Sequence, residues 1–259
     1  MDNDPGKLSD KGHWDSLYSG IKLPRLPDLA QHHSRACERF LEPYLEPRRG
    51  GSLLEVGCGA SAWLPHFAGK YGLKASGLDY SEQGCKLAAE NLRLQGFEPE
   101  GIFCADLAAF TPPRLYDAIF SYGVVEHFSD FNSVIGRMAS WLAPGGVLLT
   151  LVPNFRGIYG PINRAVAPEI LDMHVNISRE MLRSANERAG LEVQRCGYVG
   201  VLSLAVVPWS KSRGVFASKA ALSAVSYANA ALSRLLNLTG GPGTALFSPY
   251  LMSAAWRKK

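Results

Sequence analysis

The residues best suited to chemistry are a pair of glycines followed at intervals by acidic side chains. Gly57 and Gly59 lie within residues 53–60 (LLEVGCGA), directly after a run typical of a buried strand. Glycines at such a point let the backbone turn tightly and approach a ligand closely. Asp79 (in GLDYS) and Asp106 (in CADL) end the next two β-rich runs. Ligands of open α/β sheets bind beyond the carboxyl ends of the strands, where these acids can meet ribose hydroxyls and an adenine amino group.

Glu55 distinguishes between two kinds of nucleotide ligand. A nicotinamide-dinucleotide site presents its glycine turn to a pyrophosphate, which a carboxylate such as Glu55 would repel. A cationic sulfonium ligand with an amino group meets no such repulsion. The third glycine of the dinucleotide fingerprint is also absent, with Ala62 in its place. A sulfonium cofactor is therefore favoured, and a dinucleotide oxidoreductase stays as an alternative.

Two histidines are candidates for acid–base chemistry. His127 follows the expected fourth strand in the sequence VEHF, and His174 lies in LDMH. Transfer of a group to a nucleophile needs a general base only when the nucleophile must lose a proton, as a hydroxyl does. The alternative for His127 is to hold its loop or contact the substrate, and the alternative for His174 is to anchor a loop.

The elements that must position these residues alternate between strand and helix from residue 52 onward. This order predicts a doubly wound, mainly parallel α/β sheet. The expected strands are 52–56, 74–78, 101–104, 116–122, 146–152, 191–199 and 250–256. The expected helices are 62–69, 82–95, 131–142 and 178–189, and residues 154–168 are expected to form a loop.

Two segments stand outside this alternation. Residues 1–50 are expected to form an N-terminal cap with one helix, 29–45, packed on a core domain that spans 51–259. An insertion at about 208–248 precedes the last strand, and its residues 218–237 have helical periodicity. That helix can pack on the surface or in a dimer contact, cover an apolar acceptor pocket as a lid, or touch a membrane peripherally.

Composition limits the classes of function. The chain has 259 residues, 47% of them hydrophobic, and a net charge of +4 without a clustered basic patch, so no nucleic-acid partner is expected. The five cysteines are scattered without a CxxC pair, so neither a metal site nor a disulfide framework is expected. The polar N-terminus does not resemble a signal peptide, and no apolar run is long enough to span a membrane. We expect a cytoplasmic protein without stable membrane insertion.

At this point a family resemblance becomes clear. The segments LLEVGCGAS, GLDYS, CADL, YDAIFSYGVVEHF and LAPGGVLLTLVPN resemble the ordered motifs of class I S-adenosylmethionine-dependent methyltransferases. They are most similar to the group that includes ubiquinone-biosynthesis O-methyltransferases and many natural-product methyltransferases. The resemblance covers about residues 51–199 and, more weakly, the last strand. It implies a seven-stranded Rossmann-like sheet whose last strand is antiparallel.

The resemblance also implies which residues bind the cofactor. Glu55, Gly57 and Gly59 would line its methionine part, and Asp79 its ribose, with Tyr80 beside it. The adenine would meet Asp106 and Leu107, and the sulfonium side would meet Ser121 and Tyr122. Trp14 and Tyr18, in GHWDSLY, resemble an N-terminal aromatic element that folds over the cofactor, although they can instead anchor the N-terminus.

These inferences predict a methyltransferase that acts on a small molecule and produces S-adenosylhomocysteine. Oxygen is the preferred acceptor atom, and nitrogen or carbon is the alternative. The Asn/Asp-Pro-Pro-aromatic tetrad that often accompanies amide and nucleobase acceptors is replaced by SYGV at residues 121–124. A cofactor-binding protein without catalysis is the competing class, and a homodimer is left open.

Overall fold

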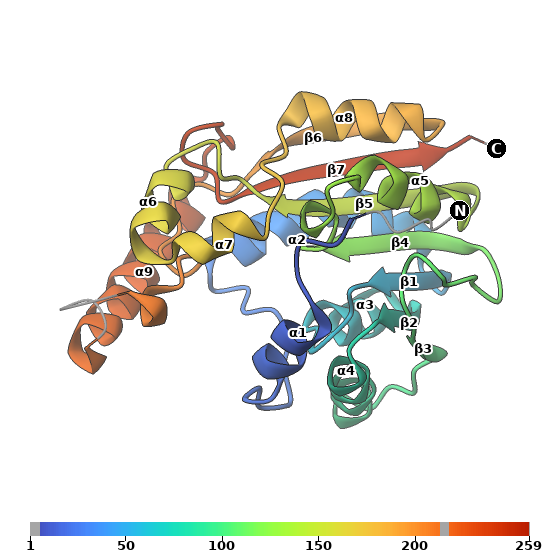
Figure 1. Ribbon diagram of the computed structural model, residues 1–259, viewed down its shortest axis with the longest axis horizontal. Coiled ribbons are helices and arrows are strands. Elements are labelled where there is room, and N and C mark those ends of the chain that lie inside the picture. Colours follow the sequence, from blue (N-terminus) through green and yellow to red (C-terminus); the bar gives the residue numbers. More distant parts are fainter. Residues whose placement is uncertain (1–5, 213–217, 259) are drawn as a thin grey trace.

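The computed structural model describes residues 6–212 and 218–258. They form a seven-stranded sheet in the order β3-β2-β1-β4-β5-β7-β6, in which β7 runs antiparallel to its neighbours β5 and β6 (Figure 1). The strands are β1 Ser52–Val56, β2 Lys74–Asp79, β3 Gly101–Cys104, β4 Tyr116–Tyr122, β5 Leu142–Pro153, β6 Leu191–Val199 and β7 Tyr250–Arg257. This topology confirms the predicted doubly wound sheet with an antiparallel last strand.

Helices cover both faces of the sheet and enclose two apolar clusters. One face packs against α2 (His32–Leu45), α3 (Trp63–Tyr71) and α4 (Glu82–Leu94). The other packs against α5 (Phe131–Ser140) and α8 (Arg179–Arg188). Leu53 of β1 joins the first cluster and Leu54 the second, because successive side chains of a strand point to opposite faces. A central strand buried on both faces explains the nearly continuous apolar run at 52–56.

Parallel pairing brings the ends of the strands that carry the predicted site to one edge of the sheet. In the register, Val56 lies opposite Leu78, and Asp79 lies opposite Cys104. The glycine turn after β1 therefore lies beside Asp79, and the segment that contains Asp106 follows directly after β3. The α4 helix then starts at Ser81, whose hydroxyl accepts a hydrogen bond from the Gly84 amide, as an N-cap does.

Two parts of the sequence prediction were wrong about helices. The first fifty residues hold α1 (Lys11–Tyr18) and the short η1 (Glu46–Arg48) besides α2. The α1 helix buries no residue, so it offers no apolar stripe for periodicity to detect, although Asp10 caps it by accepting from the His13 amide at 2.7 Å. Residues 154–168, expected as loop, contain α6 (Tyr159–Val166) and lead into α7 (Pro168–Asp172).

The N-terminal cap and the insertion differ in how they join the domain. The α2 helix contributes Phe40, Leu41 and Leu45 to the core, so the expected cap helix is built into the main fold. The insertion contains η3 (Trp209–Lys211) and α9 (Lys219–Thr239), while its residues 213–217 lie outside the described part. The α9 helix extends from the side of the molecule beside α6 (Figure 1).

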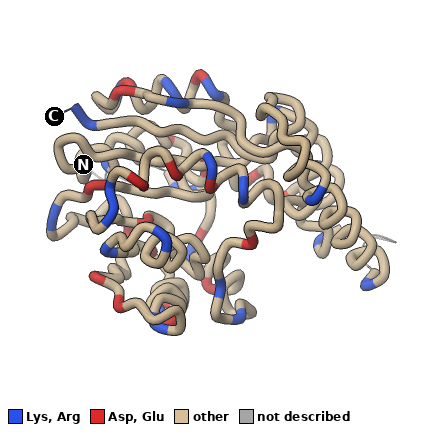
Figure 2. The backbone as a smooth tube through the Cα atoms, turned by 180° about the vertical axis from the view of Figure 1, so that it is seen from behind, with Lys and Arg blue, Asp and Glu red and all other residues tan. Residues whose placement is uncertain are grey.

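The surface carries charges of both signs. Figure 2 shows basic and acidic residues interspersed along much of the chain, whereas few charged residues mark α9. No helix within the described ranges is both long and apolar enough to cross a membrane.

Candidate cofactor and acceptor site

A cavity opens at the carboxyl ends of β1, β2 and β4, where ligands of open α/β sheets bind. Many predicted site residues line it: Trp14, Tyr18, Gly57, Asp79, Tyr80, Asp106, Leu107, Tyr122 and His127. Four other predicted residues are not part of its lining, namely Glu55, Gly59, Ser121 and His174. Most of the site residues predicted from the sequence thus line one cavity, although some of them are far apart in the chain.

The turn after β1 requires glycine at both predicted positions. Gly57 has a φ of +73° and Gly59 a φ of +27°, in the region that favours glycine. A Cβ on Gly57 would collide with Val124, and one on Gly59 would collide with the Tyr18 hydroxyl. The backbone amides of Gly57 and Cys58 both donate to the Leu78 carbonyl, which fixes the turn against β2.

Asp79 connects this turn to the start of α4. It is buried and accepts hydrogen bonds from the Gly59 and Ser81 amides, each at 2.8 Å. The Tyr18 hydroxyl lies 3.5 Å from its Oδ2. Burial raises the pKa of Asp79 although the backbone amides oppose this shift. Asp79 therefore shapes the glycine turn as well as lining the cavity.

Glu55 lies beneath the turn. It is 2% exposed and both of its oxygens lie 2.8 Å from the Ser61 hydroxyl, which donates to the carboxylate. Burial raises its pKa to about 8. The carboxyl is thus mostly protonated near neutral pH in the free protein. The expected repulsion of a pyrophosphate by Glu55 consequently applies only once a ligand has ionised this group.

The segment that precedes α1 pairs with the third strand-end acid. Lys7 forms an ion pair with Asp106, and both side chains are partly exposed. Burial opposes ionisation of Asp106, but the Lys7 ammonium and the Ala108 amide together outweigh it, and the pKa of the carboxyl is lowered. Asp106 also accepts from the Ala108 amide at 2.9 Å. Sequence reasoning missed Lys7, because no spacing relates it to an acid so distant in the chain.

The aromatic residues of α1 cover the cavity. The Trp14 ring meets the His127 ring edge-on at 5.0 Å between centroids, and the Trp14 indole donates to the Ser9 hydroxyl at 3.0 Å. The Leu8 amide donates to the His127 carbonyl at 2.8 Å, which fixes the start of this segment to the loop after β4. Trp14 and Tyr18 thus line the cavity, and the segment before α1 is hydrogen-bonded to the loop after β4.

The two residues at the end of β4 differ in their surroundings. Ser121 is fully buried, and its hydroxyl has no hydrogen-bond partner among the described residues. Tyr122 lines the cavity, and its hydroxyl donates to or accepts from the Tyr250 hydroxyl at 2.7 Å. Tyr122 is therefore held in place by β7, the last strand of the sheet.

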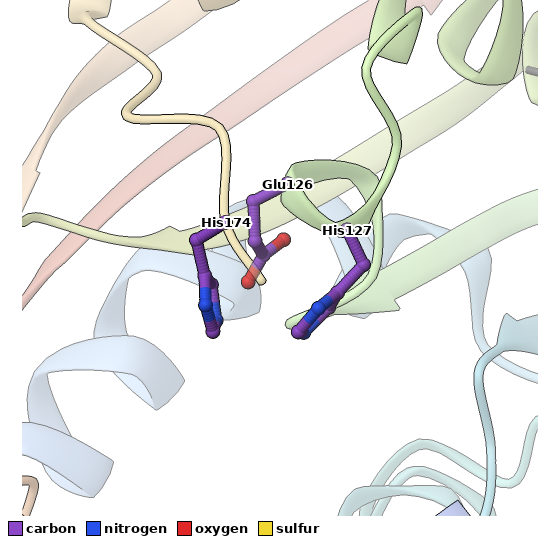
Figure 3. Close-up of side chains that lie close together, drawn as sticks. All are labelled: Glu126, His127 and His174. Carbon is purple, nitrogen blue, oxygen red and sulfur yellow. The ribbon is translucent and has the colours of Figure 1, made fainter. Parts of the chain in front are cut away.

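The cavity wall at His127 leads to a group of three ionisable side chains, of which two are buried and one is half-buried. Glu126 and His127 belong to η2 (Val125–His127), and His174 follows α7 (Figure 3). The two imidazole centroids lie 4.2 Å apart. Burial raises the pKa of Glu126 to about 8 and lowers that of His127 to about 3. Burial also lowers the pKa of His174.

This environment bears on the two predicted roles of the histidines. An efficient general base has a pKa near the working pH, so a buried His127 is a weak base in the free protein. His174 donates from Nδ1 to the Ile170 carbonyl, and the neighbouring Val175 amide donates to the Glu126 carbonyl at 2.7 Å. The segment around His174 is thereby held against η2, as a loop anchor would be.

The arrangement of sheet, glycine turn and acids is that of class I S-adenosylmethionine-dependent methyltransferases. A sequence profile of the family described as "Methyltransferase domain" matches residues 29–195. The chain belongs to this family, as its sequence motifs predicted.

Individual relatives carry both oxygen and nitrogen methyltransferase names. The chain is 29% identical to a ubiquinone biosynthesis O-methyltransferase of Bradyrhizobium sp. over 54% of this chain and 56% of the relative. It is 28% identical to norajmaline N-methyltransferase of Rauvolfia serpentina over 51% of this chain and 46% of the relative. Alignments with the first curated relatives span between 30 and 56% of the relatives' own lengths.

Solved structures share the fold at low sequence identity. The N-methyltransferase NodS of Bradyrhizobium japonicum, in complex with S-adenosylhomocysteine, superposes with a TM-score of 0.59 at 15% identity, covering 96% of this chain and 98% of that one. The [4+2]-cyclase SpnF superposes with a TM-score of 0.62 at 19% identity, covering 98% and 97%. The same fold therefore occurs in proteins with different activities.

Proposed function

We propose that the protein transfers the methyl group of S-adenosylmethionine to an oxygen atom of a small molecule. The observation that carries this proposal is the single cavity that joins the glycine turn and strand-end acids to His127. Methyl transfer is an in-line displacement, and its rate depends on holding donor and acceptor at contact distance. One shared cavity meets this requirement.

In this proposal the donor occupies the end of the cavity formed by β1, β2 and β3. The turn at Gly57 and Gly59 lets the methionine part approach the backbone, and its amino group ionises Glu55 beneath. Asp79 accepts from the ribose hydroxyls. Asp106 accepts from the adenine amino group once Lys7 has moved aside.

The acceptor then lies between the donor and His127. Its oxygen attacks the methyl carbon while the carbon–sulfur bond breaks, and the electron pair of that bond returns to sulfur. The proton of the hydroxyl leaves to solvent or to a nearby group. Because His127 and His174 are weak bases in the free protein, we assign them the task of orienting the acceptor.

Nitrogen is the second candidate for the acceptor atom. A neutral amine attacks without prior loss of a proton, so it does not require the base that His127 is poorly suited to be. The cavity walls near His127 include Trp14, Tyr122 and Phe128, aromatic faces that also suit an amine. The similarity to norajmaline N-methyltransferase supports this alternative.

The experiment is transfer of a labelled methyl group from S-adenosylmethionine to matched acceptors. We would present phenols and catechols beside amines of the same carbon skeleton and identify the methylated atom by mass spectrometry. Methyl ethers as the main products are expected. Methylated amines as the main products would identify nitrogen, in place of oxygen, as the acceptor atom. Absence of methyl transfer to either set of acceptors, together with no binding of S-adenosylhomocysteine, would reject the proposed function.

A further inference from the structure

Two of the three ionisable side chains beside the cavity are buried and carry polar atoms without a hydrogen-bond partner among the described residues. Glu126 is 1% exposed and His127 is 7% exposed. The Oε2 atom of Glu126 and the Nδ1 atom of His127 lack a hydrogen-bond partner within the described part of the chain. A buried polar atom without a partner costs about 1–3 kcal/mol, so such atoms call for a ligand or another specific role.

These atoms come together with a third side chain at ligand spacing. Glu126, His127 and His174 each offer one ligand atom, and these atoms lie within 4.8 Å of one another. In the view of Figure 3 the Glu126 carboxylate lies between the two imidazole rings. Ligand atoms around a tetrahedral zinc ion lie about 3.4 Å apart, given bonds of about 2.1 Å, so a bound metal ion would draw these atoms together by at most about 1.4 Å.

One of the two imidazoles is oriented by the backbone through its second nitrogen. His174 uses Nδ1 to donate to the Ile170 carbonyl, which leaves its Nε2 lone pair available. Metal-bound histidines characteristically donate their other ring N–H to a carbonyl or carboxylate in this way. The Nδ1 atom of His127 has no hydrogen-bond partner among the described residues, so it too is available to a ligand.

We propose that Glu126, His127 and His174 bind a divalent transition-metal ion, for which Zn²⁺ is the best match. Two imidazoles and one carboxylate are an established set of zinc ligands, with further positions open. Mg²⁺ and Ca²⁺ prefer all-oxygen sites, so this set selects against them. The proposal departs from the sequence-based expectation of no metal, because His174 is distant in the chain from the Glu126–His127 pair and forms no motif with it.

The proposal that these residues bind metal depends only on their geometry. The role of the ion in the reaction rests on the proposed function. His127 lines the cavity, so the ion lies at the wall where the acceptor would sit. A hydroxyl that coordinates the ion loses its proton to water more readily than a free hydroxyl. The ion would thus supply the activation that the two weakly basic histidines do not, and it would favour oxygen acceptors.

The test is calorimetric titration of the metal-free protein, without a histidine tag, with ZnCl₂. We expect one ion per chain in the wild type, and at least about tenfold weaker binding in Glu126→Gln and His174→Gln. His66→Gln is the matched control, since His66 pairs with Glu38 between α3 and α2, and should bind zinc like the wild type. Co²⁺ in place of Zn²⁺ should give the visible absorption of a tetrahedral site.

Two results would overturn the proposal. The wild type could show no stoichiometric zinc binding and no cobalt spectrum, or both ligand variants could bind zinc as tightly as the wild type. Thermal unfolding and titration with S-adenosylhomocysteine, run on every variant without metal, show that the fold is retained. If the wild type binds S-adenosylhomocysteine but not zinc, the metal site alone is rejected. If the wild type does not bind S-adenosylhomocysteine, the proposed function is rejected.

Discussion

The N-terminal segment and the α9 helix both lie outside the sheet, yet they relate to the site in opposite ways. The segment that leads through α1 pairs Lys7 with Asp106 and places Tyr18 beside Asp79. No described residue of the insertion lines the cavity. The α9 helix instead attaches to α2 and to the loop near residue 204. The position of α9 thus favours surface packing over the lid alternative.

The chemistry of the two attachments also differs. The buried residues of α9 are Asn229 and Ser233, both polar. Asn229 accepts from the amides of Leu204 and Ala205 and donates to Gln31. Apolar residues such as Tyr227, 78% exposed, and Leu238, 86% exposed, face outward. An apolar periodicity therefore identifies a helix without telling which of its faces packs on the protein.

Removing the N-terminal segment should change ligand affinity more than any substitution on α9. Deletion of residues 1–18 removes Trp14 and Tyr18 from the cavity wall. We therefore expect the affinity for S-adenosylhomocysteine to fall about ten- to hundredfold. The double variant Tyr227→Ala, Leu238→Ala on α9 is the matched control and should bind as the wild type does. Equal affinity of the truncated and intact proteins in a calorimetric titration would remove the N-terminal segment from the site.

The pH dependence of binding tests the buried carboxyl beneath the turn. The pKa of Glu55 is raised to about 8 in the free protein, so ligand binding must release its proton below that pH. Affinity for S-adenosylhomocysteine should therefore rise between pH 6 and pH 8, by at most about tenfold per pH unit, and level off above. Glu55→Gln should abolish this slope. An affinity that falls with rising pH in this window would show that the carboxyl does not meet the amino group.

The polar attachment of α9 predicts an effect on stability alone. Asn229→Ala leaves the Leu204 and Ala205 amides without their acceptor, so the free energy of unfolding should decrease by about 1–3 kcal/mol. Denaturant titration of this variant beside Tyr227→Ala measures the difference, and the exposed Tyr227 should matter by less than about 0.5 kcal/mol. A larger loss for Tyr227→Ala would mean that the outward face of α9 is covered in solution.

The smallest expected effect concerns the ion pair between Lys7 and Asp106. Lys7 and Asp106 are partly exposed, and such pairs contribute about 1 kcal/mol or less. Lys7→Ala frees Asp106 for the cofactor, so affinity for S-adenosylhomocysteine should rise by no more than about fivefold. A tenfold loss would instead make Lys7 a ligand of the cofactor.

The sequence predicted those features that are local or that follow from strand order. The glycine turn, Asp79 and Asp106 each end a strand, and parallel pairing alone brings them to one edge. The helix α1 escaped prediction because it buries no residue, and Lys7 because its partner lies far along the chain. The pairing of His174 with the Glu126–His127 pair escaped for the same reason. The protonated state of Glu55 arises from burial, which no motif encodes.

Titration of the protein with S-adenosylhomocysteine, beside the Asp79→Asn variant, tests the central claim most directly. We predict micromolar binding to the wild type, no response to NADH, and at least about tenfold weaker binding to Asp79→Asn, since a neutral amide replaces the carboxylate that we propose to bind the ribose. Asp130→Asn, which changes only the exposed N-cap of α5, should bind normally. Binding of NADH in place of S-adenosylhomocysteine, or an unchanged affinity in Asp79→Asn, would contradict the account.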